Sequence, residues 1–148
     1  MDLSDSNDWE KEDAIPKAKT KKSFDAFWFD LIKYRLKFPT TEAEARLAYK
    51  YTNGCGSMDG ASVPNTIGFV SVESACHKHD IKWGVATCYQ DLLDANDEFT
   101  GDIKRICDYE SNWFTNFLRR QIIALWSYGV DKLGTDSYAR KRGFINDV

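Results

Sequence analysis

The sequence contains only two histidines, four cysteines and three prolines, and it has no long apolar run. No segment approaches the roughly 18–20 apolar residues that a membrane-spanning helix needs. The formal net charge of −3 gives the chain as a whole no attraction to nucleic acid or to an anionic membrane. We therefore expect a soluble protein with no nucleic-acid partner.

The apolar residues that are present suffice for one globular domain. Hydrophobic residues make up 43% of the 148 positions and aromatic residues 14%, and a chain of this length can bury a core without crosslinks. Residues 1–22 differ, because acidic positions are followed by a basic run with few apolar residues, a composition typical of a disordered arm. We expect a single domain over residues 23–148, present as a monomer.

Helical periodicity dominates this domain, and the sequence shows no convincing series of strands and no internal repeat. Phe24 and Leu31 belong to an apolar face that we expect to continue to Phe38 and to end before Pro39. Thr41 is a suitable N-cap for the next helix. The later helices are expected at about residues 42–51, 71–85, 89–107 and 111–133.

Both histidines lie in the segment CHKHDIKW, residues 76–83, which is expected to be helical. Cys76, His79, Asp80 and Trp83 occupy positions i, i+3, i+4 and i+7 and therefore share one helical face. A glycine-rich stretch, NGCGSMDG, precedes this helix and can turn backbone carbonyl oxygens inward. Carbonyl oxygens with a carboxylate are the ligands that Ca2+ prefers, and a neighbouring histidine could take a proton from water beside the ion.

Two other interpretations of this segment stay open on the residues alone. His79 is also compatible with a core histidine whose nitrogens are satisfied by neighbouring groups. A zinc site could use Cys76, His79, Cys88 and Cys107, although the wide separation of the last two differs from the close cysteine pairs of structural zinc sites.

Four motifs in order, NGCGS, CHKHD, DANDEF and KRIC, resemble the secreted phospholipases A2 and are closest to the group XII type. The tail ALWSYGVDKLG is similar to small bacterial and fungal members. The likeness covers about residues 50–108 well and 111–134 loosely. It implies an all-α fold with two long antiparallel, disulfide-linked helices, a calcium loop and additional terminal helices. It also implies a secreted enzyme that hydrolyses the sn-2 ester of glycerophospholipids with Ca2+ and contacts phospholipid membrane surfaces transiently.

The resemblance assigns a role to each matching residue. His79 would be the general base that activates the attacking water. Asp80 would be the carboxylate ligand of Ca2+, and the backbone carbonyls of Gly54, Gly56 and Met58 would complete the protein ligands. Ca2+ and the amide of Gly56 would stabilise the oxyanion that forms when the ester carbonyl is attacked.

The resemblance also implies two disulfides, Cys55–Cys76 and Cys88–Cys107. The second requires Cys88 to fold back through a loop, because a continuous helix would separate the two residues by about 29 Å. Disulfides are typical of oxidising compartments. The first 22 residues nevertheless include no apolar segment that resembles a signal peptide.

Two positions depart from the family pattern. The family has an aspartate where this chain has Asn96, and where this chain has Trp83 it has a tyrosine whose hydroxyl bonds that aspartate. Helical angles place Asn96 on the inward face with Phe99, whereas Asp97 lies about 100° around the helix. An asparagine carbonyl can accept the N–H of His79 but cannot offset an imidazolium charge. The alternative function is therefore a phospholipase-like module that binds calcium or lipid with weak or no catalysis.

Overall fold

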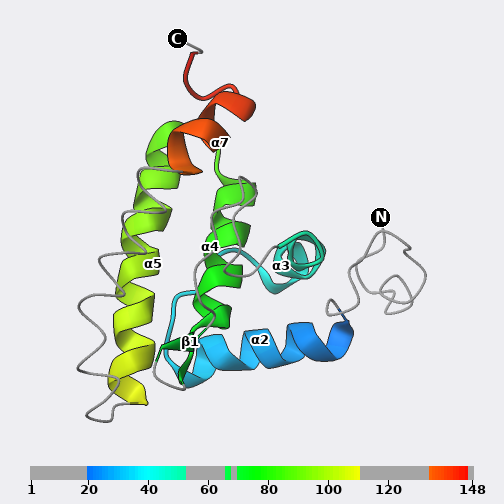
Figure 1. The fold of residues 1–148 in the computed structure, drawn as a ribbon. Helices are drawn as coiled ribbons and strands as arrows, with labels where there is room; N and C mark the ends of the chain where they lie inside the picture. The colour runs from blue at the N-terminus through cyan, green and yellow to red at the C-terminus, as the bar shows by residue number, and fades with distance from the viewer. Residues whose placement is uncertain (1–19, 53–65, 68–69, 111–133, 147–148) are drawn as a thin grey trace.

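The computed structural model describes residues 20–52, 66–67, 70–110 and 134–146, and these residues form five α-helices and one pair of short strands (Figure 1). The prediction of a mainly α-helical fold is confirmed. The predicted helix at residues 111–133 and the predicted arm up to residue 19 lie outside the described residues. In chain order the elements are α2 (Lys21–Lys33), α3 (Glu42–Tyr49), β1 (Thr66–Ile67), β2 (Val70–Ser71), α4 (Glu73–Val85), α5 (Tyr89–Tyr109) and α7 (Thr135–Lys141).

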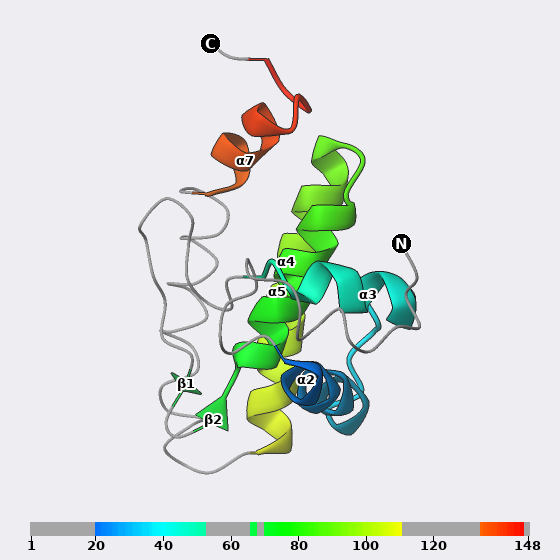
Figure 2. The ribbon, with the colours of Figure 1, turned by 90° about the vertical axis from the view of Figure 1, so that its right-hand side faces the viewer.

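The antiparallel helices α4 and α5 form the centre of the described fold and lie side by side (Figures 1 and 2). Only residues 86–88 connect them, so the chain reverses direction at once. α5 buries Phe99, Ile103 and Ile106, which recur every three or four residues, in the same core cluster as Cys76 of α4. Each helix boundary agrees with its prediction to within two residues. None of the described helices is both long enough and apolar enough to cross a membrane.

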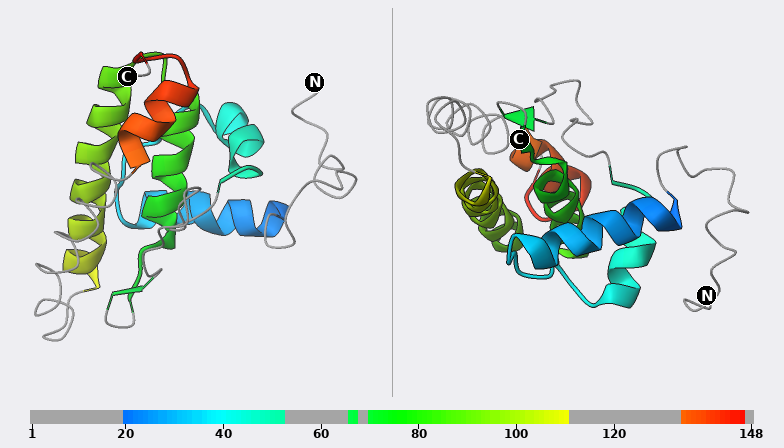
Figure 3. Two further views of the ribbon diagram at one scale, coloured as in Figure 1. Left: turned by 45° about the horizontal axis from the view of Figure 1, so that its top comes forward. Right: turned by 90° about the horizontal axis from the view of Figure 1, so that it is seen from below.

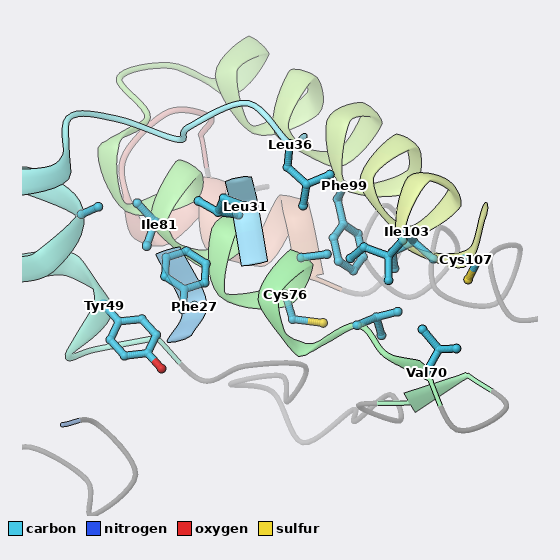
Figure 4. Close-up of a cluster of buried hydrophobic side chains, with 14 of the residues drawn as sticks. Phe27, Leu31, Leu36, Tyr49, Val70, Cys76, Ile81, Phe99, Ile103 and Cys107 are labelled. Carbon is cyan, nitrogen blue, oxygen red and sulfur yellow. The ribbon is translucent and has the colours of Figure 1, made fainter. Parts of the chain in front are cut away.

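The two helices that precede α4 in the chain, α2 and α3, both pack against it (Figure 3). Phe24, Phe27 and Leu31 are buried on one face of α2, as the predicted amphipathic pattern requires. They share a core cluster with Tyr49 of α3 and Ile81 of α4 (Figure 4). The rings of Phe27 and Tyr49 stack there with their centroids 5.2 Å apart, so this aromatic cluster fixes α2 and α3 against α4.

Side-chain caps set the starts of α2 and α3. At α2, Thr20 Oγ1 accepts the amide N–H of Ser23, and Ser23 Oγ accepts the amide N–H of Thr20. Residues 21–22 therefore belong to α2, which begins two residues before the expected start of the domain at residue 23. At α3, Thr41 Oγ1 accepts the amide N–H of Glu44 at 3.3 Å, which confirms the predicted cap.

α2 ends well before the predicted position at Phe38. Arg35 adopts a φ of 57°, and the amide of Leu36 bonds the carbonyl oxygen of Leu31 at 2.8 Å. This is the bonding pattern of a Schellman motif, in which a left-handed residue terminates a helix. Phe38 is consequently outside the helix, where its ring stacks on that of Trp28 with centroids 4.5 Å apart.

A short strand pair that the sequence did not predict precedes α4. Thr66 pairs with Ser71 and Ile67 with Val70 in an antiparallel arrangement. Because Ser71 is used in β2, α4 begins at Glu73 instead of at residue 71.

One of the two predicted disulfides is contradicted, and the partner predicted for the other is not described. Cys76 in α4 is disulfide-bonded, and its expected partner, Cys55, lies outside the described residues. Cys88 and Cys107 do not form a disulfide, so that prediction is wrong. Cys88 is the N-cap of α5, which continues past Cys107 and separates the two by about 29 Å, whereas a disulfide needs Cα atoms within about 7 Å. The expected disulfide link between α4 and α5 is therefore absent, and packing and polar side-chain contacts join these two described helices.

Candidate active site

His79 lies in α4 and is enclosed between two aromatic side chains. Its ring centroid is 4.6 Å from that of Trp83 and 4.8 Å from that of Phe99 on α5. The residue is only 7% exposed. Because most of the residue is shielded from water, neighbouring protein groups set the orientation of the ring.

A chain of hydrogen bonds connects His79 to α5 and α7. His79 Nε2 lies 2.7 Å from Asn96 Oδ1, and Trp83 Nε1 donates to the same oxygen at 3.1 Å. The amide nitrogen of Asn96 donates to Thr135 Oγ1 at 2.9 Å. Asn96 and Thr135 are both buried, so these bonds face little competition from water.

These bonds determine which nitrogen of His79 carries the proton. An indole N–H can only donate, so the Asn96 atom that Trp83 contacts is the amide oxygen. That oxygen can only accept, so Nε2 of His79 must carry a proton. Nδ1 then keeps its lone pair, and no described residue donates a hydrogen bond to it. The ring is arranged as a base at Nδ1.

The environment keeps His79 uncharged at neutral pH. Burial lowers the pKa of His79 from 6.5 to about 4, the bond to Asn96 opposes this shift, and the nearby Lys82 charge adds to it. The ring can therefore accept a proton at neutral pH, but only weakly.

The structure confirms Asn96, and not Asp97, as the partner of His79. Asn96 and Phe99 face α4 and are buried, while Asp94 and Asp97 are exposed on the other side of α5. The helical angles of the sequence gave the correct register here because α5 is regular throughout this segment.

α7 supports the site from a part of the chain outside the sequence motifs. The ring of Tyr138 stacks on that of Trp83 with centroids 4.9 Å apart, and its hydroxyl donates to the carbonyl oxygen of Trp83 at 3.2 Å. Arg142 donates to the carbonyl oxygens of Trp83 at 3.0 Å and Ala86 at 2.8 Å. These carbonyls end α4, where a cation is stabilising. α7 thus caps α4 and holds the indole in place.

Sequence reasoning missed two members of this network. Thr135 contacts Asn96 across 39 positions, and it begins a seven-residue helix that was not predicted. The sequence places Trp83 on the face of His79 without a tyrosine hydroxyl, but it does not predict that the indole N–H bonds the partner of the histidine. Its position four residues after His79 on the same helical face was the available signal.

An ion network next to the histidine holds α4 and α5 in register. Lys78 Nζ lies 2.6 Å from Glu98 Oε1 and 2.8 Å from Asp102 Oδ2. Lys82 Nζ lies 2.8 Å from Glu98 Oε2. Lys78 is almost completely buried, and these carboxylates offset the cost of removing its ammonium group from water. Two cations on α4 facing two anions on α5 resist rotation of either helix and keep the histidine opposite its partner.

The second histidine, His77, is a core residue outside this site. Its Nδ1 lies 2.7 Å from Thr52 Oγ1, and its Nε2 lies 3.2 Å from Glu73 Oε1. The ring packs edge-on against Phe27 and Tyr49. Both nitrogens have partners, which is the arrangement expected of a structural histidine.

The expected calcium ligands are described only in part. Asp80 follows the histidine and is partly exposed, whereas residues 74–79 are buried, and its carboxylate is a donor of the type that Ca2+ prefers. Gly54, Gly56 and Met58 lie outside the described residues. Among the residues that are described, no three His, Cys, Asp or Glu side chains gather in a group that could hold a metal ion. A calcium site made mainly of backbone carbonyls would not need such a group.

The zinc alternative is contradicted. Cys76 is disulfide-bonded and offers no thiolate, and Cys88 and Cys107 lie at opposite ends of α5. All four proposed ligands are among the described residues, and they do not form a metal-binding group.

Comparisons of this chain with models of protein families, with curated proteins and with solved structures found no match. The case for a function therefore rests on the residues of the site and their geometry.

Proposed function

We propose that the protein is a calcium-dependent phospholipase A2, which hydrolyses the sn-2 ester of glycerophospholipids to a lysophospholipid and a fatty acid. The observation that carries the proposal is the buried pair of His79 and Asn96 on two antiparallel helices. The pair lies at the positions where the motifs of the secreted phospholipases A2 put a base and its partner. The tautomer of His79 leaves Nδ1 as the basic atom.

In this proposal His79 is the general base. Its Nδ1 removes a proton from a water molecule as the oxygen of that water attacks the ester carbonyl, and the ring becomes an imidazolium. The N–H at Nε2 stays bonded to Asn96 and keeps the ring oriented. Transfer of the proton from Nδ1 to the departing glycerol oxygen completes the hydrolysis.

Asp80 and the backbone carbonyls of Gly54, Gly56 and Met58 are the proposed calcium ligands. Bound Ca2+ supplies stabilisation of the negative charge that develops on the ester carbonyl oxygen. A secreted location belongs to the same proposal. The disulfide at Cys76 supports it, because such bonds persist in oxidising compartments.

A second candidate function is a phospholipase-like module that binds calcium or lipid and turns over slowly or not at all. Asn96 favours this candidate, because a neutral amide stabilises an imidazolium less than a carboxylate does. The pKa of about 4 at His79 has the same consequence, since a weak base removes a proton from water less readily. Parallel measurements of vesicle binding and of hydrolysis distinguish the two candidates.

The outer face of α2 is the surface that we propose for contact with phospholipid. Phe29 and Ile32 are neighbours on this face and are 62% and 56% exposed. Lys22, two turns before Phe29, is exposed, whereas the acidic Asp25 on this face is paired with Arg46 at 3.5 Å. Figure 3 shows α2 on the outside of the described fold. An apolar face with a positive edge fits a bilayer surface that contains anionic lipid.

Fatty-acid release from vesicles of mixed zwitterionic and anionic phospholipid tests the calcium requirement. Asp80→Asn should abolish release and weaken calcium binding, because it removes the only charged ligand proposed. Asp97→Asn, which makes the same chemical change on the exposed side of α5, should leave release unchanged. Release that persists in Asp80→Asn, or in the presence of EDTA, would contradict the proposal.

A further inference from the structure

We propose that Trp83 is the positioning residue that selects the tautomer of His79, and that it acts through the side-chain amide of Asn96. The inference concerns the ring that the proposed function uses as its base. The test measures which nitrogen of that ring carries the proton, and it does not depend on hydrolysis.

A tautomer of His79 must be selected because the amide of Asn96 can be oriented in two ways. An amide has one accepting end and one donating end of nearly the same shape, so it can face His79 in two orientations. With the oxygen toward the ring, Nε2 must carry the proton and Nδ1 is basic. With the nitrogen toward the ring, Nε2 must accept, and the proton moves to Nδ1. Only the first orientation leaves a base on the side of the ring away from Asn96.

Thr135 and Trp83, the other two partners of this amide, differ in how strongly they fix its orientation. Thr135 Oγ1 lies 2.9 Å from the amide nitrogen, and a hydroxyl, unlike an indole N–H, has both an accepting and a donating capacity. The indole N–H of Trp83 lies 3.1 Å from the amide oxygen and can only donate. In the reversed orientation two donors would face each other in a buried site. Loss of such a bond disfavours the reversed form roughly 5- to 100-fold.

The structure also holds Trp83 where this selection requires it. Its ring lies between those of His79, at 4.6 Å, and Tyr138, at 4.9 Å. Arg142 and the hydroxyl of Tyr138 both donate to its backbone carbonyl oxygen. The direction of the indole N–H is thereby set by α7, and the selection follows from the packing of α7 on α4.

A carboxylate at position 96 would remove the need for selection, because both of its oxygens accept. Trp83 should therefore matter for the tautomer only while residue 96 is an asparagine. This dependence of one residue on the identity of another is specific to tautomer selection. If the indole had only a structural role, its loss would have the same effect whether residue 96 is an amide or a carboxylate.

The experiment measures the 15N shifts of the histidine ring nitrogens at neutral pH without metal, with His79→Gln used to assign the signals. In the wild type Nε2 should carry the proton. Trp83→Phe keeps an aromatic ring against Tyr138 but removes the N–H, and the form protonated at Nδ1 should rise roughly 5- to 100-fold. Trp28→Phe, the same change outside the site, should have no effect.

Two further variants complete the test. Asn96→Asp combined with Trp83→Phe should restore the proton to Nε2. Thr135→Val should retain the wild-type tautomer while lowering stability, because only the donating end of the amide loses its partner. The inference is overturned if Trp83→Phe keeps the wild-type tautomer, if the double variant fails to restore it, or if Thr135→Val changes it. A changed tautomer in Thr135→Val overturns the inference even if Trp83→Phe does not fold.

Discussion

Lowering the pH should destabilise the protein through His79, and the burial of the ring sets the size of the effect. The pKa of His79 is about 4 in the folded protein, against 6.5 for the unperturbed side chain. Between these values the unfolded chain binds a proton that the folded chain does not. The free energy of unfolding therefore falls as the pH falls. The contribution of His79 to the free energy of unfolding is nearly complete above about pH 6.5 and is lost progressively as the pH falls toward 4.

The magnitude follows from the difference between the two pKa values. That difference is about 2.5 units, which corresponds to roughly 3 kcal/mol when the pH is well below 4. Over the narrower interval from pH 7.5 to pH 5, proton linkage gives a loss of about 2 kcal/mol.

Urea denaturation in EDTA at pH 7.5 and pH 5 measures this loss, and His79→Gln provides the comparison because glutamine does not titrate. The wild type should lose about 2 kcal/mol more than the variant between the two pH values. His77 is present in both proteins, so its contribution cancels in the comparison. Equal losses in the two proteins would refute the conclusion that His79 is buried as a neutral base.

Three other substitutions have defined outcomes. Asn96→Asp should raise calcium-dependent turnover roughly 10- to 100-fold, because a carboxylate stabilises the imidazolium. Vesicle hydrolysis at saturating calcium measures the gain, and unchanged turnover would contradict the role given to residue 96. Arg35→Gly should stabilise the protein by about 0.5–1 kcal/mol in urea denaturation. Relief of the strained φ of 57° gains about 1–2 kcal/mol, which exceeds the entropic cost of glycine of about 0.5–1 kcal/mol. A net destabilisation would show that the left-handed position is not strained. Phe29→Ser combined with Ile32→Ser should reduce co-sedimentation with anionic vesicles. Val85→Ser, which changes an exposed apolar residue on α4, should not reduce it. Equal binding by the two variants would contradict the assignment of α2 as the contact surface.

The central part of the site was predictable because it depends on two regular helices joined by a short connection. His79 faces inward from α4 and Asn96 faces inward from α5 at the positions that helical spacing gives. Once both helices are buried against each other, the inward faces must meet. Local periodicity was therefore enough to pair the histidine with Asn96 and to place Asp97 on the exposed side.

The remaining parts depend on features that periodicity does not contain. The end of α2 depends on the left-handed conformation of Arg35, a residue type with no preference for it. The contact between Thr135 and Asn96 depends on how a short helix packs far along the chain. The family resemblance implies a pairing of Cys88 with Cys107, and the unbroken helix between them rules it out.

The most direct test of the central claim, that His79 acts as the base of a calcium-dependent phospholipase, is fatty-acid release from mixed phospholipid vesicles by the wild type and by His79→Gln. Calcium affinity and vesicle binding are measured on the same samples. The account predicts release by the wild type that requires calcium, and loss of release in His79→Gln with calcium affinity and vesicle binding largely retained. Equal release by the two proteins, or no release by the wild type under any calcium concentration, would contradict it.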